Sequence, residues 1–155
     1  MDYEVITRVL EALEREHVRY AVFGAAALNF HGIARFTEDL DLFVAPEADN
    51  VERLKRALHS VFEDPTIEEI AASDLLGAYP AVQYVPPTGA FHIDLLTRLG
   101  NAFAFDDLEV VRLPFDRLTV SVVSPATLYR MKRDTVRLKD KADAQLLRER
   151  FGLTE

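Results

Sequence analysis

The chain has 155 residues, a net charge of −8 and no cysteine. This length suits one domain with a substantial core, and the lack of cysteine excludes a disulfide framework or a thiolate site. The negative charge argues against broad, nonspecific binding to nucleic acid, but a local basic groove is compatible with it. No apolar run is long enough to cross a bilayer, and the acidic start MDYEV is unlike a signal peptide, so we expect a cytoplasmic protein without a membrane partner.

The first predicted elements are a helix, a short strand and a second helix. Residues 2–17 have apolar positions at helical spacing, and Asp2 is placed to cap that helix. Residues 20–23 are a short apolar run that predicts a strand. Gly24 separates this strand from residues 25–30, whose composition favours a short helix.

Gly24 stands where a phosphate could bind. A glycine between a strand and a helix lets the backbone approach a ligand closely, and the first N–H groups of the helix can bind an anion. The helix is expected to end at Gly32, and His31 is better explained as a packing or capping residue than as a ligand contact. A lone glycine is a weak signal, so this prediction depends on the residues that follow.

Two carboxylates, Asp39 and Asp41, stand one residue apart in an apolar alternation that continues to Val44. The alternation predicts a strand on which the two share a face, roughly 7 Å apart. Like charges this close repel, and a divalent cation removes the conflict. Mg²⁺ prefers one or two carboxylates together with substrate phosphates. A lone Asp-x-Asp is common on surfaces, but after Gly24 it predicts half of a metal site facing a phosphate.

The middle of the chain predicts a covering helix and a hairpin. Residues 50–61 have the spacing of a helix that packs on the sheet, and residues 64–76 are expected to be irregular or helical. Residues 81–85 and 90–96 predict two strands joined by the Pro-Pro-Thr-Gly turn at 86–89.

Asp94 is the lone carboxylate in the second strand of this hairpin. A charge in an apolar run is costly unless it is paired or bound to a metal, so Asp94 is the natural third ligand. The alternative is a strand edge in water. His92 shares the strand face of Asp94 by the two-residue period, but we do not assign it to the site.

Residues 100–107 are expected to be a loop whose two phenylalanines belong to the core. Residues 110–115 and 118–123 predict a second hairpin, with Pro114 near an edge.

Ser124 and Pro125 predict a clean helix start, with serine as the N-cap and proline at the first helical position. Leu128, Met131 and Val136 are expected to face inward. Residues 130–150 carry eight basic and four acidic side chains, a local charge of +4. A solvated face is the ordinary explanation of such a charged segment.

Residues 23–27 (FGAAA) and 35–42 (RFTEDLDL), with a spacer between them, resemble the signature of the DNA-polymerase-beta-type nucleotidyltransferase superfamily. Within it, the chain is most similar to the small AbiEii-like bacterial proteins, several of which are toxins of toxin–antitoxin pairs. Residues 93–95 (IDL) match the later strand acid of that pattern. Residues 128–132 and 137–143 resemble the C-terminal motif of the AbiEii-like group, in which a lysine precedes an Arg-x-Lys-Asp-x-x-Asp segment.

The resemblance implies an α/β (α+β) fold, with a small, mixed, twisted sheet and helices mainly on one side. We expect a single domain over residues 1–155, with a helical segment at about 125–152. The implied reaction moves a nucleotide from an NTP to an acceptor hydroxyl, with tRNA or a protein as the acceptor and a cognate toxin or antitoxin as a partner.

The resemblance also implies roles for particular residues. The metal ligands for two Mg²⁺ ions would be Asp39, Asp41 and Asp94, and Asp94 would also accept the acceptor's proton. Lys132 would reach the triphosphate, oriented by Asp140 or Asp143. The nucleotide-binding residues would be Gly24, Ala25, Arg35, Thr37, Lys132 and Asp140.

Two alternatives stay open at this point. Ala25 stands where the superfamily usually has glycine or serine, so it lacks a hydroxyl and tolerates a positive φ poorly. A nucleotide-binding regulatory or antitoxin-like protein with little activity is therefore the second hypothesis. The third is a small-molecule transferase that resembles the antibiotic-modifying nucleotidyltransferases.

Overall fold

The computed structural model describes residues 3–77, 80–87 and 91–154. Six strands form one mixed sheet in the order β3-β4-β2-β1-β8-β7, and two short strands form a second sheet. The strands of the large sheet are β1 (Tyr20–Phe23), β2 (Asp39–Val44), β3 (Ala81–Tyr84), β4 (His92–Leu96), β7 (Val110–Phe115) and β8 (Leu118–Val123). The small sheet pairs β5 (Arg98–Leu99) with β6 (Phe103–Ala104).

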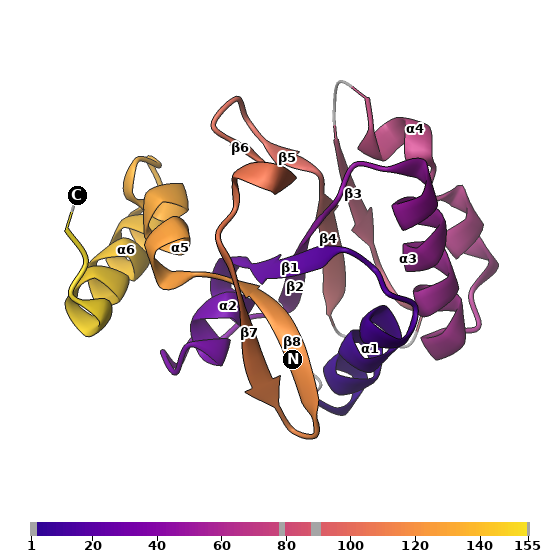
Figure 1. The fold of residues 1–155 in the computed structure, drawn as a ribbon, viewed down its shortest axis with the longest axis horizontal. Coiled ribbons are helices and arrows are strands. Elements are labelled where there is room, and N and C mark those ends of the chain that lie inside the picture. The colour runs from indigo at the N-terminus through magenta and orange to yellow at the C-terminus, as the bar shows by residue number, and fades with distance from the viewer. Residues whose placement is uncertain (1–2, 78–79, 88–90, 155) are drawn as a thin grey trace.

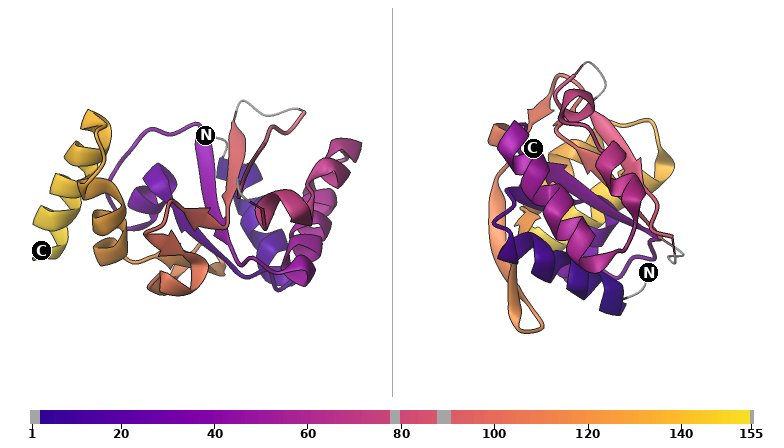
Figure 2. Two further views of the ribbon diagram at one scale, coloured as in Figure 1. Left: turned by 90° about the horizontal axis from the view of Figure 1, so that it is seen from above. Right: turned by 90° about the vertical axis from the view of Figure 1, so that its right-hand side faces the viewer.

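The sheet lies between two groups of helices (Figure 1). The helices are α1 (Tyr3–Arg15), α2 (Gly24–Phe30), α3 (Ala48–Val61), α4 (Ala72–Leu75), α5 (Pro125–Arg133) and α6 (Leu138–Phe151), with 3-10 turns at Pro65–Glu69 and Phe105–Asp107. Figure 2 shows α5 and α6 at one end of the molecule and α3 at the other. The expected fold, a small mixed sheet with flanking helices, is confirmed. None of the helices in the described part of the chain is long and apolar enough to cross a membrane.

The centre of the sheet combines parallel and antiparallel pairing. β2 is antiparallel to β1 and parallel to β4, and β1 is parallel to β8. The two predicted hairpins, β3–β4 and β7–β8, are confirmed as antiparallel pairs. Pro114 lies in β7, which is an edge strand, as its missing N–H group requires.

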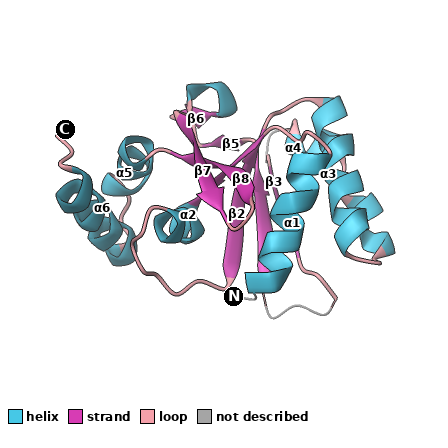
Figure 3. Ribbon diagram, turned by 60° about the horizontal axis from the view of Figure 1, so that its bottom comes forward, coloured by secondary structure: helices cyan, strands magenta, loops and turns pink. Residues whose placement is uncertain are grey.

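The alternation in β2 separates the core from the polar face. Leu40 and Leu42 are fully buried, whereas Asp39 and Asp41 on the opposite face remain partly exposed. On the core side, α1 buries the apolar stripe expected from its spacing, and α1 packs on α3, as Figure 3 also shows. The sheet thus presents one apolar and one polar face at β2, which is the arrangement that a half-buried strand predicts.

Hydrogen bonds hold the connection between α2 and β2 in place. The side chain of Asn29 accepts from the backbone N–H of Arg35 at 2.7 Å and donates to its carbonyl at 2.9 Å. The Thr37 hydroxyl bonds both backbone groups of Asp39, at 3.1 and 3.0 Å. These contacts fix the loop just before the paired aspartates.

Several boundaries differ from the expectations. The predicted loop at 100–107 contains β6 and a 3-10 turn, because its phenylalanines pack on the core and bring the chain into a short ladder with β5. The first helix ends at Arg15, since His17 adopts a positive φ of 56°. The proposed cap Asp2, the turn residues at 88–89 and Ala90 lie outside the described residues.

The C-terminal helical segment is two helices rather than one. Ser124 accepts a hydrogen bond from the Thr127 N–H group and Pro125 opens α5, as predicted. The chain then leaves the helix between Arg133 and Leu138. Val136 lies in this break with its side chain 92% exposed, so the expectation that it faces inward was wrong. The helical spacing on which that expectation rested stops at Arg133.

Candidate active site

Four polar side chains form a two-by-two array on one face of the sheet. β2 and β4 pair in parallel, and the register places Asp39 beside His92 and Asp41 beside Asp94. Side chains two residues apart on a strand share a face, so all four lie on the same side. Because neighbouring strands are about 4.8 Å apart, the array crowds three carboxylates and one imidazole together.

Crowding and burial favour the protonated form of Asp41. Desolvation is the largest cause, and the neighbouring Asp94 follows through its charge and a shared hydrogen bond; together they raise the pKa of Asp41 to about 7. Asp39 acts in the same direction, whereas the positive charge of Lys132 opposes it. The array therefore holds more negative charge than it can stabilise without a cation.

Gly24 packs directly against the Asp41 carboxylate at the start of α2. Its φ is +67°, and a Cβ built there would overlap the Asp41 side chain. Any other residue would meet both a left-handed backbone and this overlap, so the position requires glycine. Phe23 gives α2 no side-chain cap, which leaves the N–H groups of its first turn available to an anion.

Asp39, His92 and Asp94 have the spacing of metal ligands. One ligand atom from each lies within 4.8 Å of the other two. His92 Nε2 is 2.6 Å from Asp39 Oδ1 and 3.7 Å from Asp94 Oδ2. Ligand atoms that each lie about 2.1 Å from one ion are separated by distances of this order. The donor set and its excess negative charge both fit a divalent cation.

The C-terminal helices carry the cationic side of the site. Lys132 of α5 is buried, and its Nζ lies 3.0 Å from Asp143 and 3.3 Å from Asp140, both of α6. Asp143 is fully buried and also pairs with Arg35 Nε at 3.0 Å. The chain of charges Arg35–Asp143–Lys132 therefore connects α5 and α6 to the loop that precedes β2.

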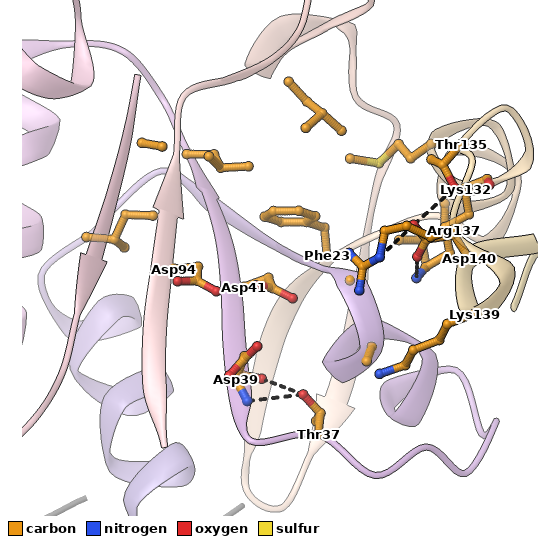
Figure 4. A pocket seen from close by; sticks show the side chains of 18 of the residues that line it. Phe23, Thr37, Asp39, Asp41, Asp94, Lys132, Thr135, Arg137, Lys139 and Asp140 are labelled. Carbon is orange, nitrogen blue, oxygen red and sulfur yellow. Dashed lines mark hydrogen bonds and ion pairs between the residues drawn. The ribbon is translucent and has the colours of Figure 1, made fainter. Parts of the chain in front are cut away.

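A pocket of about 660 Å³ lies between these two groups. The three aspartates line one wall, and Lys132, Arg137 and Lys139 line the other (Figure 4). Further lining residues come from the β1–α2 junction and from the edge strand β3, among them Phe23, Gly24, Ala25 and Gln83. An anionic ligand with a bound cation would meet opposite charges on both walls.

The sequence matches a known family over most of its length. The profile described as nucleotidyl transferase AbiEii toxin, type IV toxin–antitoxin system, matches residues 8–147. This chain belongs to the AbiEii nucleotidyltransferase family. It is an enzyme of the nucleotidyltransferase type, from a family associated with toxin–antitoxin systems. No curated protein sequence gives a significant match.

Solved structures share the fold of this AbiEii-family chain. A Thermotoga maritima protein assigned as a nucleotidyltransferase has 12% identity and a TM-score of 0.56, covering 96% of this chain and 91% of that one. The antibiotic-resistance factor ANT(2'')-Ia in solution has 14% identity and a TM-score of 0.58, with 96% and 83% covered. Its complex with adenylyl-2''-tobramycin has 13% identity and a TM-score of 0.56, with 97% and 91% covered. At these identities the likeness establishes the fold alone.

The structure brings most of the residues expected for an AbiEii-type site to one pocket. Eight of them line it: Gly24, Ala25, Thr37, Asp39, Asp41, Asp94, Lys132 and Asp140. Arg35 is the exception, because it does not line the pocket and pairs with buried Asp143 instead. Arg35 thus contacts the same aspartate as Lys132, and its nucleotide-binding role stays a prediction.

Ala25 is accommodated without backbone strain. Among the described non-glycine residues, positive φ angles occur at His17 and Asp116, so Ala25 keeps an ordinary φ. Its N–H group lies in the first turn of α2, directly after Gly24. Alanine at this position therefore lacks the hydroxyl of a serine but does not distort the first turn of α2.

Two residues of the site were not assigned from the sequence. His92 contacts Asp39 directly, and Gln83 on β3 donates a hydrogen bond to Asp94 Oδ1 at 3.3 Å. The two-residue period had already placed His92 on the face of Asp94. Gln83 faces the site because the register of the antiparallel β3–β4 pair places it opposite Asp94. No local sequence pattern predicts that register. His31 Nε2 donates a hydrogen bond to the Val123 carbonyl, and its ring packs on Phe151, which is the packing role expected for it.

Proposed function

We propose that this protein transfers a nucleotide from an NTP to an acceptor hydroxyl, with Asp39, Asp41 and Asp94 at the reaction centre. The acceptor oxygen attacks the α-phosphorus, pyrophosphate leaves with the electrons of the broken P–O bond, and the hydroxyl proton passes to a base. The observation that supports this most is the pocket itself, since the crowded carboxylates face Lys132 and Lys139 across it.

Each wall has a part in this proposal. Divalent ions, when bound, would lower the pKa of the acceptor hydroxyl and neutralise the leaving pyrophosphate. The three carboxylates would hold these ions, and the N–H groups after Gly24 would bind phosphate oxygens. Lys132, kept in place by Asp140 and Asp143, would contact the triphosphate. Thr37 holds the backbone of Asp39 and so orients the first ligand.

Asp94 is the proposed base. It lies between Asp41 on β2 and Gln83 on β3, with its side chain 31% exposed, so an acceptor hydroxyl can reach it from the pocket. Asp94 is not at a sheet edge, because β3 covers the outer side of β4.

The test compares wild type with Asp94→Asn. Each preparation is incubated with every α-labelled NTP, with Mg²⁺ or Mn²⁺, and with tRNA, total protein or an aminoglycoside as acceptor. We expect wild type to label one class of acceptor. The variant should keep most of its affinity for the metal–NTP complex, while transfer falls by ~100-fold or more, the scale of losing a general base.

The control is Asp134→Asn, which changes an exposed aspartate of the C-terminal segment outside the pocket. It should leave both binding and transfer unchanged. Wild type that binds Mg·NTP but labels no acceptor would favour the regulatory alternative. Equal transfer by wild type and Asp94→Asn would remove Asp94 from the reaction.

A further inference from the structure

His92 is the fourth side chain of the array. The roles proposed above use the three aspartates as metal ligands and give His92 no role. Its side chain is 30% exposed, comparable to Asp39 at 38% and Asp94 at 31%, so all three open toward the same space. Nε2 is the nitrogen that faces the two carboxylates. The strand register places His92 so that Nε2 lies near two carboxylates. This position suits a metal ligand better than a residue of the apolar core.

Two interpretations of this contact make different chemical demands. If His92 only donates a hydrogen bond to Asp39, it acts as a brace, and any donor of similar reach can replace it. If the imidazole binds the ion, Nε2 must present a lone pair, and no amide nitrogen can substitute. The second interpretation is compatible with the geometry, because the ligand atoms of Asp39, His92 and Asp94 lie mutually within 4.8 Å and one ion could contact all three.

We propose that His92 Nε2 is a ligand of the metal ion held by Asp39 and Asp94, a role that rests on the nucleotidyl transfer proposed above. The ion site then has one nitrogen and several oxygen donors. Carboxylate oxygens suit Mg²⁺ and Mn²⁺, whereas imidazole suits later transition metals, whose affinities also follow the Irving–Williams order. His92 therefore shifts the selectivity of this site from Mg²⁺ toward later transition metals such as Co²⁺.

The direct test is a magnetic measurement on the bound ion. Mn²⁺ is added to the full chain, alone and with inorganic tripolyphosphate, which supplies phosphate oxygens but no nitrogen. Electron spin-echo envelope modulation then detects a ligating ¹⁴N nucleus. We expect a strong ¹⁴N modulation in wild type and its loss in His92→Gln, whose side chain can still donate a hydrogen bond to Asp39.

Metal affinity gives a second readout. By calorimetry, His92→Gln should weaken Co²⁺ binding by about 10- to 100-fold and change Mg²⁺ binding by less than about threefold. The matched control is His59→Gln. His59 also pairs with a carboxylate, Glu68 at 2.7 Å, but it lies on α3 outside the pocket. This control should retain both the modulation and the affinities of wild type.

The outcomes separate this role from the proposed function. If Mn²⁺ binds and Asp39→Asn abolishes its binding, but wild type shows no ¹⁴N modulation, the metal site stands and His92 is only a brace. Equal Co²⁺ affinities of wild type and His92→Gln would overturn the ligand role in the same way. If wild type binds no Mn²⁺ with or without tripolyphosphate, the metal-dependent function fails, and the role of His92 fails with it.

Discussion

The raised pKa of Asp41 reflects the burial and the crowding of negative charge at this site in the folded chain. Its pKa rises from 3.8 to about 7, first through burial and then through Asp94. Between pH 3.8 and about pH 7, the Asp41 carboxyl keeps its proton in the folded protein and releases it in the unfolded chain. The free energy of unfolding must therefore fall as the pH rises through this window, as far as Asp41 is concerned.

Asp41→Asn removes this dependence, because the amide does not titrate. In metal-free buffer, we expect the variant to unfold with a free energy similar to that of wild type near pH 4. Near pH 8 the variant should be more stable by about 1–3 kcal/mol, since the crowded charge is absent. Urea denaturation in the presence of EDTA at both pH values measures the difference.

Asp106→Asn serves as the control, because this carboxylate is 91% exposed. It should change the free energy of unfolding by no more than about 0.5 kcal/mol at either pH. A lower stability of Asp41→Asn at pH 8 would show that Asp41 supports the fold rather than straining it.

At the level of residues, local patterns predicted the acids but not their partners. The alternation around Asp39 and Asp41 and the lone charge at Asp94 are visible in short windows. The pairing of Arg35 with Asp143 joins positions more than a hundred residues apart, so no local pattern contains it. The contact of His92 with Asp39 needs the β2–β4 register, which depends on the whole sheet.

The α5–α6 pair is the element whose position matters most for the pocket. Asp143 on α6 is fully buried between the positive charges of Lys132 and Arg35. A buried charge pair adds little net stability, but removal of one partner leaves the others uncompensated. Asp143 is thus the residue on which the placement of Lys132 depends.

Asp143→Ala should lower the free energy of unfolding by about 3–5 kcal/mol, because two cations lose a buried partner. It should also speed amide exchange in α5 and α6. Asp134→Ala removes an exposed aspartate that pairs with Arg133 at 3.2 Å, and it should have little effect on either quantity. Chemical denaturation and hydrogen exchange measure both variants. Equal effects of the two would mean that the buried pair contributes nothing to the position of α6.

Elements with a strong period or a cap were predicted well, and short irregular ones were not. Ser124-Pro125 and the strands of both hairpins follow local rules. The β5–β6 ladder has two residues in each strand, too few for a period to be visible. The break before Leu138, which leaves Val136 in solvent, lacks both glycine and proline, so the sequence carries no stop signal there.

At the scale of the molecule, the pocket lies between parts of the chain that are far apart in sequence. One wall comes from the central strands and the other from the C-terminal helices, as Figure 4 shows. A metal–nucleotide complex would contact both walls at once. The expectation of a single domain over the whole chain agrees with such a site but stays a prediction.

Binding of Mg²⁺ and a non-transferable NTP analogue should therefore slow hydrogen exchange on both walls. We expect added protection at residues 20–44 and at residues 125–151, because the ligand joins them. The turn between β7 and β8, at residues 116–117, does not line the pocket and should exchange as before. Protection limited to residues 20–44 would mean that α5 and α6 do not take part in nucleotide binding.

The parallel pairing of β2 with β4 also determines which changes of chain length the site can tolerate. Residues 62–71 connect α3 to α4 without lining the pocket, so an added residue there lengthens a connection and leaves the array intact. A change of chain length that shifts the whole five-residue strand β4 by one position has a different effect. It would turn Asp94 and His92 into the core and bring Ile93 and Leu95 to the pocket, because a one-residue slip exchanges the two faces of a strand. The chemistry proposed for this chain therefore depends on the parity of one short strand.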